Sequence, residues 1–269
     1  MPIYNAGPLL AAQLCNINKL QYPNLQIILV DDGSDDGSLA VLEAFAQGTM
    51  WQPGLGVTLL KNPVNRGVAH ARNLAVRAAL GEYLWFADWD DNWSPQIIDK
   101  MVASAVANNS DIVLCDYIAQ QGQPAKRIPA SPLLDGYAAL ALLLKKQLQS
   151  YLWAKLFRRQ LFTSDVFPLL PKMSDEAGFA QLLAKTKRIS VVPEQLYYYR
   201  DNPQSLTRTL PLSPANLIAV RQQVLGACVS NGINADTMFR RWLIHYDVYF
   251  WRYMLGAVMR RILPRGRHC

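Results

Sequence analysis

Between Leu25 and Ser110, short apolar runs alternate with longer segments of helical periodicity, and this alternation limits the possible folds more than any other feature of the chain. Strands are predicted at 25–32, 57–62, 82–88 and 111–118, and helices at 37–47, at 67–80 and from Ser94-Pro95 onward. Strands connected by crossover helices pair in parallel. The pattern therefore predicts an α/β fold with a Rossmann-like, mainly parallel sheet flanked by helices.

The region after a polar, proline-containing loop at 120–132 is less regular. It predicts helices near 136–147 and 175–186, an aromatic segment at 151–162, and strands near 188–192 and 195–200. No Gly/Ser linker divides the first 209 residues, so we interpret 1–209 as one composite domain, with a first part at about 1–118 and a second part at about 119–209. Residues 210–269 form a helical, basic and aromatic extension, with one helix from Ser213-Pro214 to Asn231-Gly232 and a final helix capped by Asp236.

The basic charge is concentrated in the C-terminal segment. Residues 239–269 contain seven arginines and one acid, a net +6 of the total +7. The chain is 269 residues long and 51% apolar, enough for a sizeable core, and no stretch reaches the roughly 18 uncharged apolar residues of a spanning helix. The four cysteines form no CxxC pair, and Met1 is followed by Pro2 and a polar turn rather than by a signal peptide. These features predict a cytoplasmic location.

Two of the predicted strands end in acidic clusters, Asp31-Asp32-Gly33-Ser34 and Asp88-Trp89-Asp90-Asp91. Ligands of open parallel sheets bind at the carboxyl ends of the strands. Carboxylates at positions i and i+2 can both coordinate a hard divalent cation and leave room for phosphate oxygens. Together the clusters indicate a site for a metal-bound diphosphate, although each alone is also compatible with an ordinary turn.

Six motifs follow one another in the order seen in a known family. They are PIYN (2–5), ILVDDGSDDGS (28–38), NRGVAHARNLAVRAALGEYLWFADWDD (65–91), WAKLFRRQLF (153–162), DEAGF (175–179) and LYYYR (196–200). Over about its first 208 residues the sequence resembles the family 2 glycosyltransferases of GT-A fold, a bacterial group that builds surface polysaccharides. The resemblance implies a nucleoside-diphosphate sugar as donor, with a nucleotide-binding part at about 1–118 and an acceptor part at about 119–209.

The resemblance also implies a donor site. Tyr4 would stack on the nucleotide, and either Asp31 or Asp32 would accept a hydrogen bond from the base. Arg72 would contact the nucleotide and its phosphates, and Arg200 could reach the diphosphate from a loop. Each residue also has a structural alternative. Tyr4 would be a packed tyrosine, the Asp31-Asp32 pair a helix-capping turn, and Arg72 a solvated helix charge.

A further implication is a divalent metal, Mn²⁺ or Mg²⁺, held by the DxD residues Asp88 and Asp90, with Asp91 acting instead of or beside Asp90. Such a cation would neutralise the leaving diphosphate.

The catalytic base of the family is the second acid of a pair at the start of a helix. Here the pair is inverted, Asp175-Glu176, and Phe179 follows. The register of the motif favours Glu176 over Asp175 as the base that removes the proton from the acceptor hydroxyl. The alternative is that both acids only stabilise a helix N-terminus.

Trp153 and Lys155 match a W-x-K segment of the family, whose tryptophan can face the acceptor sugar. A core tryptophan is the equally favoured alternative. His70 and His245 have no second histidine at ligand spacing, so they are predicted to be structural.

The N-terminus departs from the family pattern, which has an apolar strand directly before P-x-Y-N, whereas Met1 stands at the last position of that strand. The first strand is therefore expected to be truncated. Either the natural start lies upstream, or the protein is a poorly active copy; extending the reading frame backwards would separate the two.

The predicted last helix combines seven arginines with many aromatic residues: Phe239, Trp242, Tyr246, Tyr249, Phe250, Trp251 and Tyr253. Aromatic rings settle at the lipid headgroups and arginines bind anionic lipids, so the helix is predicted to lie at a membrane surface. The alternative is a helix docked on the body with solvated arginines. Nucleic-acid binding is not expected, because no recognised binding motif is present.

These expectations combine into an inverting, metal-dependent glycosyltransferase at the inner face of the plasma membrane. It would use a UDP-sugar and a saccharide or lipid-linked saccharide acceptor. The alternatives are a polyprenyl-phosphate sugar synthase, whose lipid phosphate acceptor needs no strong base, and a nucleotide-sugar-binding protein without catalysis.

Overall fold

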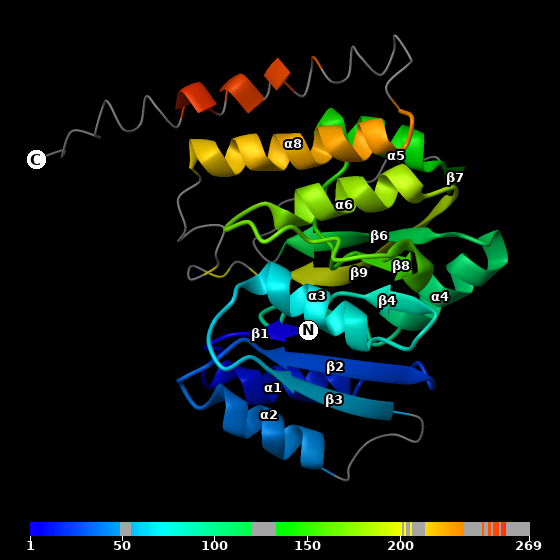
Figure 1. Ribbon diagram of the computed structural model, residues 1–269. Helices are drawn as coiled ribbons and strands as arrows, with labels where there is room; N and C mark the ends of the chain where they lie inside the picture. Colours follow the sequence, from blue (N-terminus) through cyan, green and yellow to red (C-terminus); the bar gives the residue numbers. More distant parts are fainter. Residues whose placement is uncertain are drawn as a thin grey trace, which may run out of the picture.

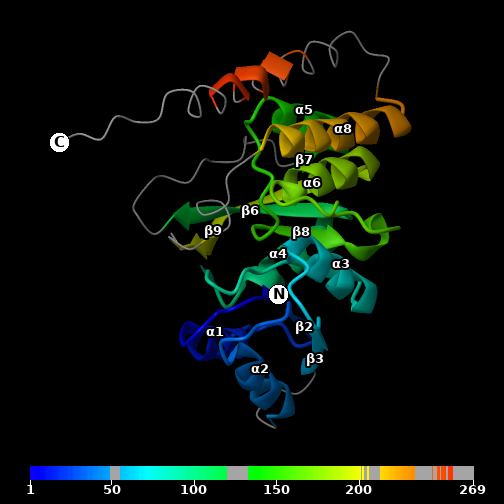
Figure 2. The same ribbon diagram turned by 60° about the vertical axis from the view of Figure 1, so that its left-hand side comes forward.

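The computed structural model describes residues 1–48, 55–119, 133–200, 202, 205, 213–233, 244, 247–248, 250–252 and 254–256. Figures 1 and 2 show a layered molecule in which a small sheet carrying the N-terminus lies below a larger sheet, and helices α5, α6 and α8 lie above the larger sheet. The predicted α/β class is confirmed by this arrangement.

The smaller sheet is entirely parallel, in the order β1-β2-β3. Its strands are β1 (Pro2–Ile3), β2 (Leu25–Asp31) and β3 (Leu55–Lys61). Helices α1 (Leu9–Ile17) and α2 (Ser38–Gln47) connect them, and α3 (Val68–Ala78) follows β3. The β2, α2, β3 and α3 segments were all predicted from periodicity. Helix α1 was not predicted.

The larger sheet is mixed, with the strand order β4-β8-β6-β9-β5 and β7 beside β9. Its members are β4 (Tyr83–Trp85), β5 (Asn92–Trp93), β6 (Ile112–Ala119), β7 (Leu133–Leu134), β8 (Lys155–Arg158) and β9 (Ile189–Tyr199). Strand β6 is parallel to β9, whereas β8 lies antiparallel between β4 and β6. The mainly parallel pairing expected from the first half of the chain thus holds for the smaller sheet. Among the described strands of the larger sheet, only β6 and β9 pair in parallel, because β5, β7 and β8 all run antiparallel to their neighbours.

The two faces of the larger sheet bury two apolar cores, as the alternation along β6 shows. Ile112 and Leu114 belong to the core under α5 (Gly136–Leu144), α6 (Ser174–Lys185) and α8 (Pro214–Ser230). Val113 and Cys115 belong to the core shared with α1 and with α4 (Ile97–Asn108). Successive strand residues point to opposite faces, so one strand joins both cores.

Three other details differ from the sequence-based expectations. The strands predicted at 188–192 and 195–200 are one strand, β9, because register shifts opposite Asp116 accommodate Pro193 and Glu194. Helix α4 begins at Ile97 rather than at Pro95, because Ser94 forms a turn with Ile97 first. The segment at 151–162 contains β8 and a 3₁₀ turn at Arg159–Leu161.

The predicted bounds of helix α8 are confirmed. Its N-terminus is capped by the Ser213 side chain, which accepts a hydrogen bond from Asn216 N. Asp236 and the loop at 120–132 lie outside the described residues. The described residues between 244 and 256 are helical, and Asp247 forms a bidentate ion pair with Arg221 of α8, at 2.7 and 2.9 Å. Among the residues described, no helix has both the length and the apolar character needed to cross a bilayer.

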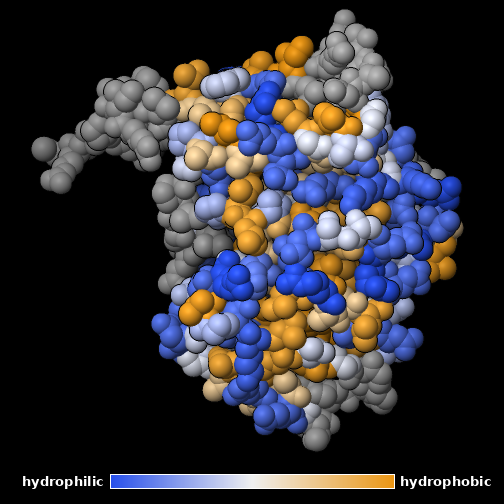
Figure 3. All heavy atoms as spheres, viewed as in Figure 1, coloured by the Kyte–Doolittle hydropathy of each residue, from blue (hydrophilic) through white to orange (hydrophobic). Residues whose placement is uncertain are grey.

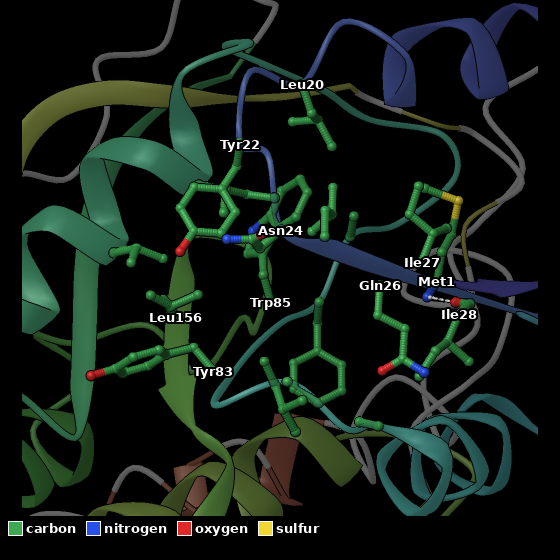
Figure 4. Close-up of a pocket in the computed structure, with 18 of the residues that line it drawn as sticks. Met1, Leu20, Tyr22, Asn24, Gln26, Ile27, Ile28, Tyr83, Trp85 and Leu156 are labelled. Carbon is green, nitrogen blue, oxygen red and sulfur yellow. Dashed lines mark hydrogen bonds between the residues drawn. The ribbon is translucent and has the colours of Figure 1, made fainter. Parts of the chain in front are cut away.

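An apolar cavity of about 430 Å³ separates the two sheets. Its walls come from β2 on one side and from β4, including Tyr83 and Trp85, on the other; Figure 4 shows these side chains and Tyr22 facing the same space. The Met1 amino group lies at the cavity and donates to Ile28 O at 2.8 Å. In Figure 3, apolar side chains reach the surface at the level of β2, between bands of hydrophilic residues.

Candidate active site

The first acidic turn, after β2, is shaped by Gly33 and Asp32. Gly33 has φ 76°, and a Cβ there would lie 2.5 Å from the carbonyl carbon of Val64, so the turn requires glycine. Asp32 is buried and accepts hydrogen bonds from Asn62 Nδ2 at 2.7 Å, Arg66 N at 3.0 Å and Gly67 N at 2.8 Å. Asp32 thus holds the start of α3 against the end of β2.

Asp31 has a different role from its neighbour. Its Oδ2 accepts two backbone hydrogen bonds of its own turn, from Gly33 N and Ser34 N, both at 3.2 Å. Its Oδ1 is buried, and no donor within the described part of the chain reaches it. A buried acceptor without a partner costs free energy. Asp31, rather than Asp32, therefore has an oxygen available for a ligand.

Tyr4 is 44% exposed in the loop after β1, so it is not the packed tyrosine of the structural alternative. The next residue, Asn5, fastens this loop to the acidic turn: its side chain donates to Asp35 Oδ1 at 2.8 Å and its backbone N–H donates to Ser34 Oγ at 3.0 Å. The loop that contains the exposed Tyr4 is thereby held beside the turn that contains Asp31.

Arg72 joins the two halves of the chain. It is buried in α3, and its Nη2 donates to Asp88 Oδ1 at 3.1 Å while its Nη1 donates to Asp175 Oδ1 at 2.5 Å. Burial opposes the charge of Arg72, but the carboxylates of Asp175 and Asp88 more than offset it and raise the pKa of Arg72. Arg72 is therefore not a solvated helix charge.

The Nε of Arg72 is also buried and has no partner within the described residues. Arginine offers five donors in a planar fork. Two of its nitrogens are held by the carboxylates, and Nε is an unused donor at the same site.

The second acidic turn places its three aspartates differently. Asp91 is buried, and its two oxygens accept from Tyr197 Oη at 2.8 Å and from Arg200 N at 2.7 Å. Burial, followed by the Asp88 charge, raises the pKa of Asp91 to about 8. Both oxygens of Asp91 are thus engaged in fastening the end of β9.

Asp88 and Asp90 are more open. The side chain of Asp88 is 30% exposed, and Asp90 Oδ2 accepts from Asn202 Nδ2 at 2.7 Å. Burial and the Asp88 charge raise the pKa of Asp90, although Asn202 and Arg200 act in the opposite direction. The charge of Arg200 thus acts at this turn, where its backbone N–H is also held.

The donor set fits a divalent cation only in part. Within the described residues no three His, Cys, Asp or Glu side chains are grouped to hold a metal ion. Asp88 and Asp90 carry hard carboxylate oxygens at positions i and i+2, and burial, together with the negative charge of Asp88, raises the pKa of Asp90. Mg²⁺ in phosphate-transfer sites is bound by one or two carboxylates together with substrate phosphates, and this pair matches that requirement.

Asp175 and Glu176 lie in the first turn of α6 but face different partners. The Asp175 side chain is 26% exposed and bonds Arg72. The Glu176 side chain is 7% exposed, and Lys146 Nζ donates to its Oε1 at 2.6 Å. The fold therefore places Asp175 toward the acidic turns and Glu176 toward the end of α5.

Trp153 and Lys155 are both buried, each 4% exposed. Trp153 stacks on the fully buried ring of Tyr197, with centroids 4.4 Å apart. Lys155 donates to the backbone carbonyl of Tyr151 and lies over the Phe179 ring, 4.9 Å from its centroid. Burial lowers the pKa of Lys155 to about 7, against the charges of Cys115 and Asp175.

Sequence reasoning missed four residues that the fold brings to this site: Lys146, Asn62, Asn202 and Tyr197. Each supports a candidate residue from a distant segment. Only Tyr197 had a signal, because it lies in the LYYYR motif. Two histidines were expected to be structural. His70 Nδ1 lies 3.2 Å from Asn62 Nδ2, and His245 lies outside the described residues.

A protein-family model described as "Glycosyl transferase family 2" matches residues 1–175. The chain is 28% identical over 227 residues to the uncharacterized glycosyltransferase EpsJ of Bacillus subtilis, covering 80% of this chain and 63% of EpsJ. It is 26% identical over 257 residues to glycosyltransferase GlyG of Streptococcus pneumoniae, covering 90% of this chain and 84% of GlyG. The chain thus spans less than two thirds of EpsJ.

Among solved structures, residues 1–349 of Staphylococcus aureus TarS in complex with UDP are similar, with a TM-score of 0.72 and 21% identity. The alignment covers 91% of this chain and 68% of that one. TarS is named as a poly(ribitol-phosphate) β-N-acetylglucosaminyltransferase. At this identity the likeness establishes the fold.

Proposed function

The chain belongs to glycosyl transferase family 2, and from this premise we propose that it moves a sugar from a nucleoside-diphosphate sugar to a saccharide or lipid-linked saccharide acceptor, with inversion at the anomeric carbon. Its fold is the GT-A fold. TarS is named as transferring N-acetylglucosamine to poly(ribitol-phosphate), and this name supports the transfer of a sugar to a polymer, here proposed to be one of cell-surface polysaccharide synthesis.

The observation that carries this proposal is the position of Arg72. One buried guanidinium bonds Asp88, in the turn that we assign to the donor diphosphate, and Asp175, in the helix turn that we assign to proton removal. The two carboxylates come from segments 87 residues apart and are fixed to the same side chain. Transfer requires donor and base to flank one reacting carbon, and the link through Arg72 supports assigning Asp88 and Asp175 to one site.

We assign the nucleotide to the pocket edge formed by Tyr4 and Asp31. The unpartnered Oδ1 of Asp31 would accept the imide N–H of uracil, and the exposed Tyr4 ring would stack on the base or ribose. The unused Nε of Arg72 and the charge of Arg200 would meet the diphosphate. UDP fits this assignment, because uracil carries an imide N–H that can donate to Asp31 Oδ1.

Asp88 and Asp90 would hold a Mn²⁺ or Mg²⁺ ion, which when bound supplies charge neutralisation of the leaving diphosphate. Asp91 would support the turn rather than bind the cation, because both of its oxygens are engaged.

The transfer step has one base and one leaving group. The acceptor hydroxyl gives its proton to a carboxylate of the Asp175-Glu176 pair, its oxygen forms the new bond to the anomeric carbon from the opposite face, and the bond from that carbon to the diphosphate breaks with its electron pair. Motif register favours Glu176 as the base. Geometry favours Asp175, because its side chain is the more exposed of the two and because Arg72 links it to Asp88.

Calorimetric titration of UDP into the full chain, with Mn²⁺ and with EDTA, tests the donor site. Binding that requires Mn²⁺ and is lost in the Asp88→Ala, Asp90→Ala double variant is the expected result. Glu194→Ala is a matched control, because this acid is in a surface ion pair with Lys100. Absence of UDP binding in both conditions would contradict the assignment.

Single variants of the acid pair test the base. Asp175→Asn is expected to lower kcat by at least about 100-fold while UDP still binds, since general base catalysis contributes about 10²–10⁴-fold. Glu176→Gln is expected to have a smaller effect, through its pair with Lys146. A larger loss of kcat in Glu176→Gln than in Asp175→Asn would make Glu176 the base. Full activity of both variants would favour the polyprenyl-phosphate sugar synthase, and UDP binding without any transfer by the wild type would favour the non-catalytic alternative.

We also propose that the C-terminal helical segment binds an anionic membrane surface. Four of its described apolar residues are 52–63% exposed and follow the spacing i, i+4, i+7, i+11, which puts them on one helix face: Ile244, Val248, Trp251 and Leu255. Seven arginines lie in the same segment. An exposed apolar face with neighbouring arginines suits the headgroup region, which would place the enzyme at the inner face of the plasma membrane.

Vesicle pelleting tests this surface. Trp251→Ser combined with Leu255→Ser, or truncation after Gly232, is expected to lower the binding of the protein to phosphatidylglycerol vesicles at least tenfold. Val229→Ser, an equally exposed apolar position on α8, should leave it unchanged. Retained pelleting of the truncated chain would rule out the proposed surface.

A further inference from the structure

An exposed aromatic ring lies near the proposed base, on a residue that no sequence motif singled out. Tyr151, in the connection between α5 and β8, is 41% exposed. Its ring is stacked on Trp153, with centroids 5.0 Å apart and planes inclined by 9°. Trp153 therefore covers one face of the Tyr151 ring, which leaves the opposite face as the one open to a ligand.

The stack beneath Tyr151 is fixed in the core. Trp153 is 4% exposed and stacks in turn on Tyr197, which is fully buried. The edge of Tyr117 packs on Trp153 with centroids 4.7 Å apart. Exposure thus rises along the stack from Tyr197 to Trp153 to Tyr151. An isolated surface tyrosine would need no explanation, but this one is the outermost ring of an immobilised column.

Two contacts place the column beside α6. The Lys155 ammonium donates to the Tyr151 carbonyl and lies over Phe179 of α6, one helical turn after Asp175. Burial and the negative charge of Asp175 raise the pKa of the Tyr151 phenol. Tyr151 therefore lies within electrostatic range of the carboxylate that bonds Arg72.

We propose that Tyr151 is the platform on which a pyranose ring of the acceptor saccharide stacks, with Trp153 acting as the buried support of that platform. This inference rests on the proposed glycosyl transfer and names the residue that would orient the acceptor. The face of an aromatic ring carries partial negative charge, and the C–H bonds on one face of a pyranose present partial positive charge to it. A ring held from behind by two others binds at a low entropic cost.

The platform also explains why Trp153, the sequence-based candidate for the acceptor contact, is buried. This tryptophan is 4% exposed and its ring stacks with Tyr197, Tyr199 and Tyr151, so it cannot itself stack on a sugar. The W-x-K motif thus identifies the supporting residue, Trp153, whereas the proposed sugar contact, Tyr151, lies two residues earlier. Acyclic polyols lack a rigid C–H face, so the platform should distinguish pyranosides from them.

Ligand-observed saturation-transfer NMR on the full chain, with UDP present, tests the proposal. The probes are methyl β-D-glucopyranoside, methyl β-D-galactopyranoside and methyl N-acetyl-β-D-glucosaminide, with ribitol for comparison. At least one pyranoside is expected to bind wild type more tightly than ribitol does. Tyr151→Leu, which keeps apolar bulk without an aromatic face, should weaken that binding at least tenfold, and Tyr151→Phe should retain it.

Calorimetric UDP titration and the melting temperature of each variant serve as the controls. Both should stay at wild-type values, because Tyr151 is outside the nucleotide site and its ring is exposed. Unchanged pyranoside binding by Tyr151→Leu would overturn the platform, as would binding by none of the three pyranosides. Absence of UDP binding by the wild type would instead contradict the proposed function. Failure of the platform and failure of the proposed function are therefore distinguishable.

Discussion

Arg72 shows how one residue can organise a site assembled from distant parts of the chain. Its side chain is 5% exposed and bonds two carboxylates, of which Asp175 is 103 positions away in sequence. Removing one partner of a buried ion pair leaves the other charges uncompensated. The same side chain should therefore matter for stability as well as for ligand binding.

We predict that Arg72→Met lowers the free energy of unfolding by about 3–5 kcal/mol and abolishes UDP binding. Arg77→Met, in the same helix, is the matched control: Arg77 pairs with Asp165 at the surface, with side chains 49% and 59% exposed. Exposed pairs contribute about 0–1 kcal/mol. Urea denaturation measures both variants, and equal losses would contradict the role of Arg72.

Lys155 predicts a pH dependence of stability. Burial lowers its pKa to about 7 from an ordinary 10.5, against the nearby Cys115 and Asp175. Between these two pH values the unfolded chain binds a proton that the folded chain has released, so this residue makes the free energy of unfolding rise with pH across that interval. Below about pH 7 both states are protonated, and the contribution is constant.

Lys155→Met should remove this dependence. We predict that the difference in unfolding free energy between wild type and the variant shifts in favour of wild type from pH 7 to pH 10, as measured by urea denaturation at intervals of one pH unit. The other titrating groups cancel in this difference. Parallel pH profiles for the two proteins would show that Lys155 keeps its ordinary pKa in the fold.

At the scale of elements, α6 carries the acid pair and depends on close packing at Gly178. A Cβ at Gly178 would lie 2.5 Å from Phe167 Cδ1, so the helix approaches the preceding loop more closely than any other residue allows. Phe167 is fully buried and donates its backbone N–H to Asn73 Oδ1 in α3, the helix of Arg72. The contact therefore helps set the separation of Asp175 and Arg72.

We predict that Gly178→Ala destabilises the protein by about 1–3 kcal/mol through overpacking. Gly226→Ala in α8 is the control, because nothing lies within 4 Å of its Cβ position; there the change should stabilise by about 0.5–1 kcal/mol through reduced chain entropy. Thermal unfolding measures both, and stabilisation by both alanines would mean that α6 has room at Gly178.

The elements were largely predictable because their signals are local. The apolar run of β2 and the Ser213-Pro214 start of α8 were recognised from a few neighbouring residues. The continuity of β9 was not predicted, because a proline such as Pro193 indicates the end of a strand and only the pairing with β6 accommodates it. Helix α1 has no side-chain cap and begins after a turn, which left it without a start signal.

At the scale of the whole molecule, the two sheets are joined by packing while the cavity lies between β2 and β4. Pairing of β1 with β2 is limited to Pro2↔Val30 and Ile3↔Asp31, with the Met1 backbone adding hydrogen bonds to Ile28 and Val30. Burial lowers the pKa of the Met1 amino group to about 5, against the charge of Asp88. An amino group that is uncharged at neutral pH is thus held in an apolar space that would suit an extended apolar strand.

We predict that adding Val-Ser-Val-Ile-Val before Met1 raises the melting temperature by several degrees, whereas adding Gly-Ser-Gly-Ser-Gly does not. Five residues in extended conformation span about 16 Å. Burying one valine or isoleucine contributes about 1.5–3 kcal/mol, and about 1 kcal/mol shifts a domain of this size by about 2–4 °C. Equal melting temperatures for the two extended proteins would show that the cavity does not accept a strand.

The family and the GT-A fold expected from the motifs are both confirmed, by the match to residues 1–175 and by the likeness to TarS. The roles of the site residues, the domain boundary near 209, the metal and the membrane contact stay predictions. They depend on ligands and surfaces that the experiments above address.

The sequence by itself determined the β2, α2, β3 and α3 segments and the acidic turns after β2 and β4, because side-chain periodicity and turn chemistry act over a few residues. Arg72 and the Asp175-Glu176 pair became candidates only through the family resemblance of their motifs. Only the tertiary structure decided that Arg72 bonds both Asp88 and Asp175, that Asp91 fastens β9, and that Trp153 supports Tyr151. Those contacts join residues whose separation in space is set by sheet pairing and core packing, and no local pattern encodes it.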